Sequence, residues 1–149
     1  MIYCNNGTWD SLTTVSDNYA KAFVTGGPIG FSSDLASLPE AYKDFWREAI
    51  AEYKRNRDIY SGCEARLLAD IDGLVAIEYS DGKFDKCIIQ VFTKRCFATD
   101  VTLYPIVDEN TEYRFGGESI SGREIKENGI VFTGISANDC KTIKLEKKV

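Results

Sequence analysis

The stretch Glu112–Ile130 reads EYRFGGESISGREIKENGI and carries an unusual density of backbone signals. Tyr113–Phe115 alternates like a strand, and Gly116-Gly117 interrupts it before a second short strand. Ser121-Gly122 then opens one helical turn, which Asn128-Gly129 ends. Such a stretch is either a site that does chemistry or a structural corner of a larger fold.

Runs of residues with a period of two surround this stretch from Cys63 onward. Branched and aromatic residues are common in these runs, and Asp72-Gly73 and Asp81-Gly82 are hairpin signals between them. About seven to eight short strands at this spacing predict a mainly β fold, an antiparallel β-sandwich over residues 62–149. The runs are CEARLLA, GLVAIEYS, CIIQVFTK, DVTLYPI, TEYRF, ESI, IVF and CKTIKLEK.

One long amphipathic helix is predicted before the strands, over residues 37–61. Ser37 and Glu40 have capping-box spacing, Pro39 suits the first turn, and Ser61-Gly62 is a plausible stop. The apolar positions recur every three or four residues, and a stripe of this size is unstable in water. We therefore expect it to lie across one face of the sandwich, with further self-association as a two-fold dimer. The candidate interface residues are Tyr42, Phe45, Trp46, Ile50 and Tyr53.

Residues 1–36 are polar and punctuated by glycine, which predicts an irregular segment with a short strand. The run TGGPIGF (residues 25–31) resembles a phosphate loop in its glycines. It lacks the Gly-Lys-Ser/Thr ending, and no clear helix follows it directly. No phosphate site is expected there.

The length and composition fit one globular domain, or one domain plus an appendage, and argue against several classes of function. The sequence has 149 residues, of which 44% are hydrophobic and 28% charged, with a net charge of −5. The acidic balance argues against nucleic acid and against an anionic membrane surface. No run approaches the roughly 18 apolar residues of a membrane span, and the N-terminus lacks the pattern of a secretory signal.

The chain has five cysteines and no histidine. The odd number and the absence of Cys-x-x-Cys spacing predict unpaired thiols in a reducing compartment, and hence a cytoplasmic protein. Without histidine, the commonest general base and zinc ligand and every Ser–His or Cys–His nucleophile are absent. We predict no cofactor and no metal site. The cysteines are Cys4, Cys63, Cys87, Cys96 and Cys140.

Paired carboxylates are the remaining catalytic candidates. A glycosidase needs two carboxyl groups about 5 to 9.5 Å apart across a pocket. Most of the candidate pairs lie at or beside predicted turns, where acids are common because they are solvated and cap backbone groups. We therefore interpret them as turn residues. The pairs are Asp70/Asp72, Asp81/Asp85, Asp108/Glu109 and Glu124/Glu127.

Aromatic side chains raise the alternative of a sugar-binding face, because exposed aromatic rings stack on pyranose rings. Trp46 lies on the helix stripe, and Tyr79, Tyr104 and Tyr113 lie on predicted strands, where burial is the usual role. Trp9 lies among polar residues and has no assigned place.

The stretch Glu112–Ile130, with the turn before it, resembles the C-terminal region of the large α-galactosidases of glycoside hydrolase family 36, the melibiase type. In that family a turn with Asp and Tyr leads into a strand, and Y-x-G-x-x-L and a Gly-Leu/Ile pair follow before the final strands. Here Ile replaces the usual Tyr and Leu. The matching residues are Asp108, Tyr113, Ile120, Gly122, Ile125, Gly129 and Ile130.

The upstream segment GPIGFSSDLASLPEAYKDFWREAIAEYKRNRDIY is similar to the segment that closes the barrel in this family. Both have a Gly-rich strand, Asp-Leu, a cap and a helix with I-x-x-Y-K-x-x-R. Over roughly residues 20–149, the resemblance implies the last βα unit of a TIM barrel followed by the C-terminal β-sandwich. The matching residues are Asp34, Leu35, Leu38, Glu40, Ile50, Tyr53, Lys54 and Arg57.

The resemblance also implies what is missing. The family's nucleophile and acid/base aspartates lie in K-W-D and S-G-G-G-x-x-D segments on earlier barrel strands, and neither segment occurs in this sequence. No catalytic residue is therefore carried over, and Glu112–Ile130 is interpreted as a structural corner.

Three functional hypotheses follow. The first is a non-catalytic domain like the C-terminal domain of an α-galactosidase, as a fragment or as one part of a split enzyme, with a TIM-barrel catalytic partner or a second copy of itself. The second is a stand-alone carbohydrate-binding module. The third is an enzyme with an unrecognised carboxylate pair. Nucleic acid and membrane partners are not expected.

Overall fold

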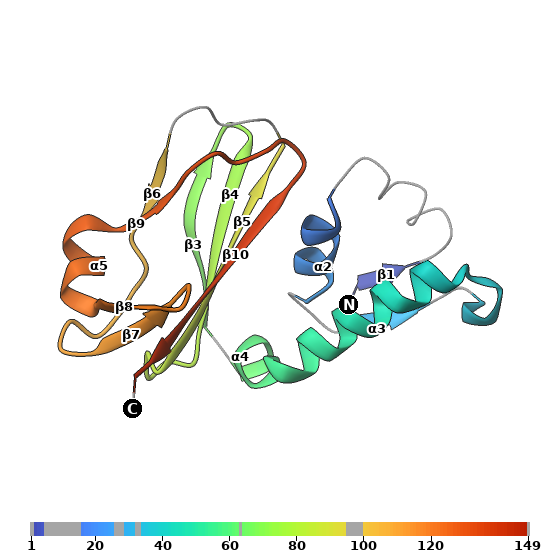
Figure 1. Ribbon diagram of the computed structural model, residues 1–149, viewed down its shortest axis with the longest axis horizontal. Coiled ribbons are helices and arrows are strands. Elements are labelled where there is room, and N and C mark those ends of the chain that lie inside the picture. Colours follow the sequence, from blue (N-terminus) through green and yellow to red (C-terminus); the bar gives the residue numbers. More distant parts are fainter. Residues whose placement is uncertain are drawn as a thin grey trace.

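The computed structural model describes residues 2–4, 16–25, 29–31, 34–62, 64–94 and 100–148, and it has a β-rich part and a helical part (Figure 1). The β-rich part holds eight strands among the described residues, and all of their pairings are antiparallel. This confirms the predicted fold class. The strands are β3 (Glu64–Ile71), β4 (Leu74–Ser80), β5 (Lys86–Thr93), β6 (Val101–Leu103), β7 (Glu112–Phe115), β8 (Glu118–Ser121), β9 (Ile130–Phe132) and β10 (Cys140–Lys147).

Six of these strands form one sheet in the order β3-β4-β5-β10-β7-β8, and β6 pairs with β9 in a second, small sheet. Strand β10 joins the two halves of the large sheet. Its Ile143 lies opposite Ile89 of β5, and its Glu146 lies opposite Arg114 of β7. Residues far apart in sequence therefore meet at the middle of the sheet.

The main core lies between the large sheet and a layer made of β6, β9 and the short helix α5 (Gly122–Asn128). Tyr113, Ile125 and Leu145 are completely buried there, at 0% exposure. Each large apolar side chain buried in this way contributes about 1.5–3 kcal/mol. The sandwich is thus closed on its second face partly by a helix.

The N-terminal residues were predicted to be irregular with a short strand, but they contain two strands and a helix. Strands β1 (Ile2–Cys4) and β2 (Ile29–Phe31) pair in parallel, and α2 (Asp17–Thr25) connects them. Parallel strands need such a crossover connection. Parallel pairing between distant residues leaves no local signal, and the apolar run of α2 is short, which explains the difference.

The predicted long helix is broken at Asn56. It consists of a 3-10 turn (Leu35–Ser37), α3 (Glu40–Arg55) and α4 (Arg57–Gly62). The Asn56 side chain donates to the Glu52 carbonyl oxygen at 3.0 Å and to the Glu52 carboxylate at 2.9 Å. Side chains that bond to the preceding turn compete with regular helix, which accounts for the break.

The predicted capping box is wrong. The Ser37 hydroxyl donates to the Asp34 carbonyl oxygen, and the N-cap position of α3 is Pro39, which offers no side-chain bond. Glu40 forms ion pairs with Lys43 and Arg47 instead of reaching back to the cap. Ser37 and Glu40 have the spacing of a capping box, but the Ser37 side chain bonds within the preceding 3-10 turn.

Only the end of the helical segment lies against the sheet. Ile59 of α4 packs with Tyr79 and Ile88 of the sheet. Helix α3 instead extends away from the sandwich and packs beside α2 (Figure 1). The expectation that the whole helix lies across the sandwich is therefore wrong for α3 and right for α4. In the ranges described, none of the helices has the length and apolar character that a membrane crossing requires.

Candidate functional site

A pocket of about 610 Å³ lies where the helical part meets the large sheet. We call it the junction pocket. Helices α2, α3 and α4 contribute one side, and strands β5, β9 and β10 with Thr133 contribute the other. The residues central to its polar chemistry are Thr25, Glu52, Tyr60, Gln90 and Lys144.

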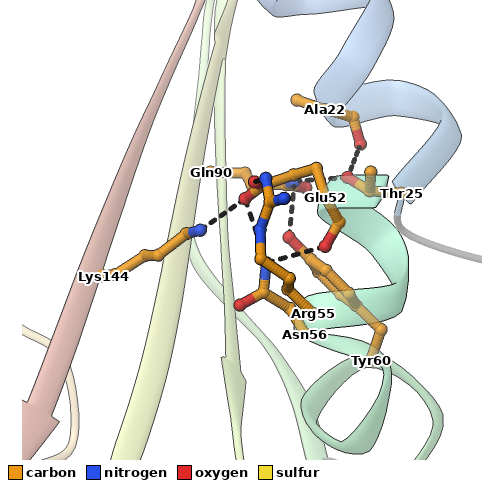
Figure 2. A network of polar contacts seen from close by, with 8 residues as sticks. All are labelled: Ala22, Thr25, Glu52, Arg55, Asn56, Tyr60, Gln90 and Lys144. Atoms are coloured by element: carbon orange, nitrogen blue, oxygen red, sulfur yellow. Dashed lines mark hydrogen bonds and ion pairs between the residues drawn. The ribbon is translucent and has the colours of Figure 1, made fainter. Parts of the chain in front are cut away.

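Gln90 of β5 is 1% exposed and lines this pocket. Its Nε2 donates to Thr25 Oγ1 at 3.2 Å and to Tyr60 Oη at 3.3 Å, as Figure 2 shows. Thr25 Oγ1 in turn donates to the Ala22 carbonyl oxygen at 3.0 Å. The Gln90 Oε1 is buried and accepts no hydrogen bond from any described residue. An unmatched buried acceptor costs about 1–3 kcal/mol.

Glu52 of α3 ties the helical part to the sheet. Its carboxylate pairs with Lys144 of β10 and with Arg55, at 2.7 Å for the latter (Figure 2). Partial burial would raise the pKa of Glu52, but the ion pairs with Lys144 and Arg55 outweigh burial and hold the pKa below its ordinary value. Glu52 is therefore ionised at neutral pH and suits anchoring rather than proton donation.

Tyr60 and Cys140 stay neutral at physiological pH. Burial raises the pKa of Tyr60 to about 12 and that of Cys140 to about 12. The Tyr60 ring stacks on Tyr53, with centroids 6.3 Å apart, and meets Tyr79 edge-on at 5.1 Å. A protonated thiol is a poor nucleophile, so Cys140 does not supply covalent chemistry here.

The predicted interface residues lie on α3 and are partly covered by the chain itself. Trp46 is buried and meets the half-buried Phe45 edge-on at 5.1 Å. The Lys21 ammonium of α2 lies 5.6 Å from the centre of the Phe45 ring. Tyr42, Ile50 and Tyr53 are half-buried. A role of these residues in an interface with another chain stays a prediction.

Among the predicted carboxylate pairs, Asp70 and Asp72 line a second pocket of about 480 Å³ at the β3–β4 turn, whereas the pairs at Asp81/Asp85 and Asp108/Glu109 are engaged in turns and ion pairs. Asp81 and Asp108 accept hydrogen bonds from backbone N–H groups in turns. Asp85 pairs with Lys147, and Glu109 pairs with Lys126. The pKa of Asp108 is lowered by its hydrogen bonds to Asn110 and Thr111, and that of Glu109 is lowered by Lys126. Both shifts oppose the raised pKa that a general acid needs.

Asp70, Asp72, Glu124 and Glu127 are exposed. Across the described part of the chain, no three Cys, Asp or Glu side chains gather as metal ligands would.

Among the candidate aromatic residues that the structure describes, no face of several exposed rings is assembled. Trp46, Tyr79 and Tyr113 are buried, so their ring faces are not open to a sugar. Tyr104 is 56% exposed. Trp9 lies outside the described residues.

The stretch Glu112–Ile130 forms a structural corner. A side chain at Gly122 would overlap the carbonyl oxygen of Asp108, and one at Gly129 would lie 2.9 Å from the carbonyl oxygen of Leu103. Gly129 also has a φ of +70°, which favours glycine. Ser121 caps α5 by accepting a hydrogen bond from the Glu124 N–H at 3.1 Å. Close approach of neighbouring backbone therefore requires glycine at positions 122 and 129.

Two buried polar residues were missed by the sequence analysis. Gln90 lies in the run CIIQVF, and Glu78 lies in the run LVAIEY. Glu78 is 2% exposed and pairs with Arg66 at 2.8 Å while it accepts from the Ile106 N–H at 3.0 Å. A lone amide or carboxylate within an apolar strand could have indicated these two residues. Such groups are normally buried only when they are hydrogen-bonded or ion-paired.

Comparisons with known proteins find similarity in structure but none in sequence families. No protein-family model matches the sequence, and no curated protein matches it. Among solved structures, the GH36 α-galactosidase AgaA from Geobacillus stearothermophilus is 18% identical, over 86% of this chain and 19% of its own, with a TM-score of 0.76. The α-galactosidase from Lactobacillus brevis is 14% identical, over 87% of this chain and 20% of its own, with a TM-score of 0.77.

The chain has the fold of one part of the GH36 α-galactosidases. An α-amylase from Geobacillus thermoleovorans is a more distant neighbour, 16% identical over 89% of this chain and 33% of its own, with a TM-score of 0.57. This chain therefore spans about a fifth of the length of the α-galactosidases that it matches. The expected likeness to a barrel end plus a sandwich is confirmed at the level of fold.

Proposed function

We propose that this chain is a non-catalytic domain of an α-galactosidase-type glycoside hydrolase, where it completes the barrel and braces it with the sandwich. The fold likeness to about a fifth of two GH36 α-galactosidases supports this proposal. About four fifths of each of those two chains has no counterpart in this one. Here, the remaining barrel strands come from another segment or another polypeptide.

The observation that carries the proposal is the parallel pair of β1 and β2. The order β1-α2-β2-α3 consists of two successive βα units, the repeating unit of a TIM barrel. Parallel sheets occur almost only with both faces covered, and two strands alone are not a stable parallel sheet. Within the described residues the pair has three residues in register and no third strand. The unpaired outer edges of β1 and β2 could therefore form hydrogen bonds with neighbouring barrel strands.

The carboxylates support a non-catalytic role. Glu52 is the only acid among the described residues that line the junction pocket. Glycoside hydrolysis normally needs two carboxyl groups, with one pKa raised so that it donates a proton. The lowered pKa of Glu52 and its pairing with Lys144 do not meet this need.

Assembly with a barrel partner is the direct test. The purified chain is mixed with a polypeptide that carries the KWD and SGGG segments but lacks the final strands. We expect a one-to-one complex that hydrolyses nitrophenyl α-galactoside, whereas this chain alone shows no turnover. Turnover by this chain that is lost on replacing one Asp or Glu would refute the non-catalytic role.

Hydrogen exchange identifies the docking edge in the same mixture. The amides of β1 and β2 are expected to exchange quickly in the free chain and slowly in the complex. Strand β3, at the far edge of the large sheet, is the internal control and is expected to keep its rate. A complex that protects β3 and leaves β1 and β2 unchanged would contradict the proposed mode of docking.

We also infer a reducing, cytoplasmic location. Cys87 and Cys140 are buried and unpaired, as predicted for both. Cys63 and Cys96 lie outside the described residues, so their predicted free state stays a prediction.

A further inference from the structure

The junction pocket contains an unmet polar group. Gln90 is almost fully buried, and its amide nitrogen already serves Thr25 and Tyr60. Thr25 in turn donates to the Ala22 carbonyl oxygen, so the order Gln90 to Thr25 to Ala22 is a consistent chain of donors. The Gln90 oxygen is left without a donor among the described residues.

The size and walls of the pocket suit a small molecule with both polar and apolar faces. About 610 Å³ lies within the usual range for ligand pockets, roughly 300–1,000 Å³. Phe132 and Ile143 give an apolar wall, and Thr25, Tyr60 and Thr142 bring hydroxyl groups. Such walls match a ring or short chain that has C–H groups on one side and hydroxyl groups around its rim.

The charges around the pocket favour a neutral ligand. Three lysines line it, but each is already engaged. Lys21 pairs with Glu48 at 2.6 Å, Lys144 pairs with Glu52, and Lys141 donates to the Thr133 carbonyl oxygen. An anion would have to compete with these contacts, whereas a neutral hydroxyl group leaves the ion pairs in place.

We propose that the junction pocket binds a small neutral polyhydroxylated molecule, a monosaccharide or a polyol, whose hydroxyl groups meet the Gln90 amide, Thr25 and Tyr60. Because the Gln90 oxygen is covered, binding turns the amide or shifts a neighbouring side chain. This inference does not depend on assembly with a barrel. A water molecule bound at the same place is the competing account, since waters commonly satisfy buried polar groups.

The chain offers a direct reporter, because Gln90 is its only glutamine. Selective ¹⁵N-glutamine labelling gives one pair of side-chain amide signals in an NMR spectrum. Galactose, myo-inositol, glycerol and inorganic phosphate are titrated separately into the full chain at millimolar concentrations. We expect saturable shifts of the Gln90 signals with at least one of the three neutral probes, and none with phosphate.

Gln90→Leu is the decisive variant. It removes the unmatched amide while keeping similar volume, so the free protein is expected to unfold at an equal or higher temperature. Its affinity for the neutral probe, followed through the backbone signals of Thr25 and Thr142, is expected to fall at least about tenfold. A purely structural glutamine would not combine unchanged stability with lost binding.

Thr93→Val is the matched control on the same strand. Thr93 is buried and its hydroxyl bonds to the Ser136 carbonyl oxygen at 2.6 Å, but it does not line the junction pocket. We expect this variant to lose stability and to keep the probe affinity. Absence of saturable shifts with all four probes would overturn the proposal and leave water as the occupant. Binding of phosphate alone would also overturn it, because the pocket would then select an anion.

Discussion

The corner at residues 108–130 and the junction pocket solve the same problem of buried polar groups in opposite ways. In the corner, Tyr113 accepts a hydrogen bond from the Asp108 N–H at 3.0 Å and donates to the Phe84 carbonyl oxygen at 2.9 Å. Asp108 accepts from the Asn110 N–H at 3.0 Å. In the junction pocket, Gln90 keeps an unmatched oxygen.

The contrast separates stability from function. The corner matches the polar groups of Tyr113 and Asp108 with neighbours and is closely packed at Gly122 and Gly129, so folding alone explains these residues. In the junction pocket, the unmatched oxygen of Gln90 lowers the free energy of unfolding, and an apolar residue at position 90 would avoid this loss. Positions where a buried polar group lacks a hydrogen-bond partner are commonly functional sites. The predictions below test whether the two regions also differ in their response to change.

The largest effect is expected from the double variant Phe45→Ser and Trp46→Ser. Trp46 is buried, and truncating a buried Trp or Phe costs about 3–5 kcal/mol. Because α3 packs mainly on the helical part, we expect that part to unfold while the corner stays folded. Hydrogen exchange by region measures this, with sedimentation to follow self-association. An unchanged unfolding midpoint and sedimentation coefficient would show that the stripe is not buried.

Gly122→Ala is expected to destabilise the corner by about 3 kcal/mol or more, because the new methyl group overlaps the Asp108 backbone. Denaturant unfolding followed by near-UV circular dichroism measures the change. Gly62→Ala is the matched control, since nothing lies within 4 Å of its added carbon. Equal midpoints for the two alanine variants would mean that the close approach at Gly122 does not restrict the corner.

Glu52→Gln is expected to cost less, about 1 kcal/mol at most, because its ion pairs are partly exposed. The folded pKa of Glu52 lies below its ordinary value of 4.5, so its stabilisation is complete at neutral pH. It is lost as the pH falls through the folded pKa. The free energy of unfolding of the parent and the variant should therefore converge in acid. A constant difference from pH 7 to pH 3 would contradict this role.

The smallest effect concerns thiol labelling, which should leave stability unchanged. Burial raises the pKa of both Cys87 and Cys140, and that of Cys87 is raised further. Cys87 lies in the sandwich core, whereas Cys140 lines the junction pocket. We expect Cys140 to react first with an alkylating reagent, as followed by peptide mass spectrometry. Faster labelling of Cys87 would mean that the core opens before the junction.

The sequence predicted what local residues determine. Alternation, Asp-Gly turns and the Ser121 cap depend on neighbours in sequence, so the strands, the hairpins and α5 were found. The parallel pair β1–β2 and the Glu52–Lys144 ion pair join residues far apart, and nothing local marks them. The break at Asn56 was missed because amphipathic periodicity continues through it. The junction pocket, made from both parts, was therefore out of reach.

Strand β10 has a consequence for the order of folding. Strands β3, β4 and β5 follow one another along the chain and pair as neighbours, and β7, β8 and α5 form a second local unit. Among the strands that the structure describes, only β10 pairs with both, and its partner residues in β5 are about fifty positions away. Until it inserts, β5 and β7 expose open edges that invite pairing with other chains. We expect the arrival of this strand to set the folding rate and the time during which the chain is vulnerable to aggregation.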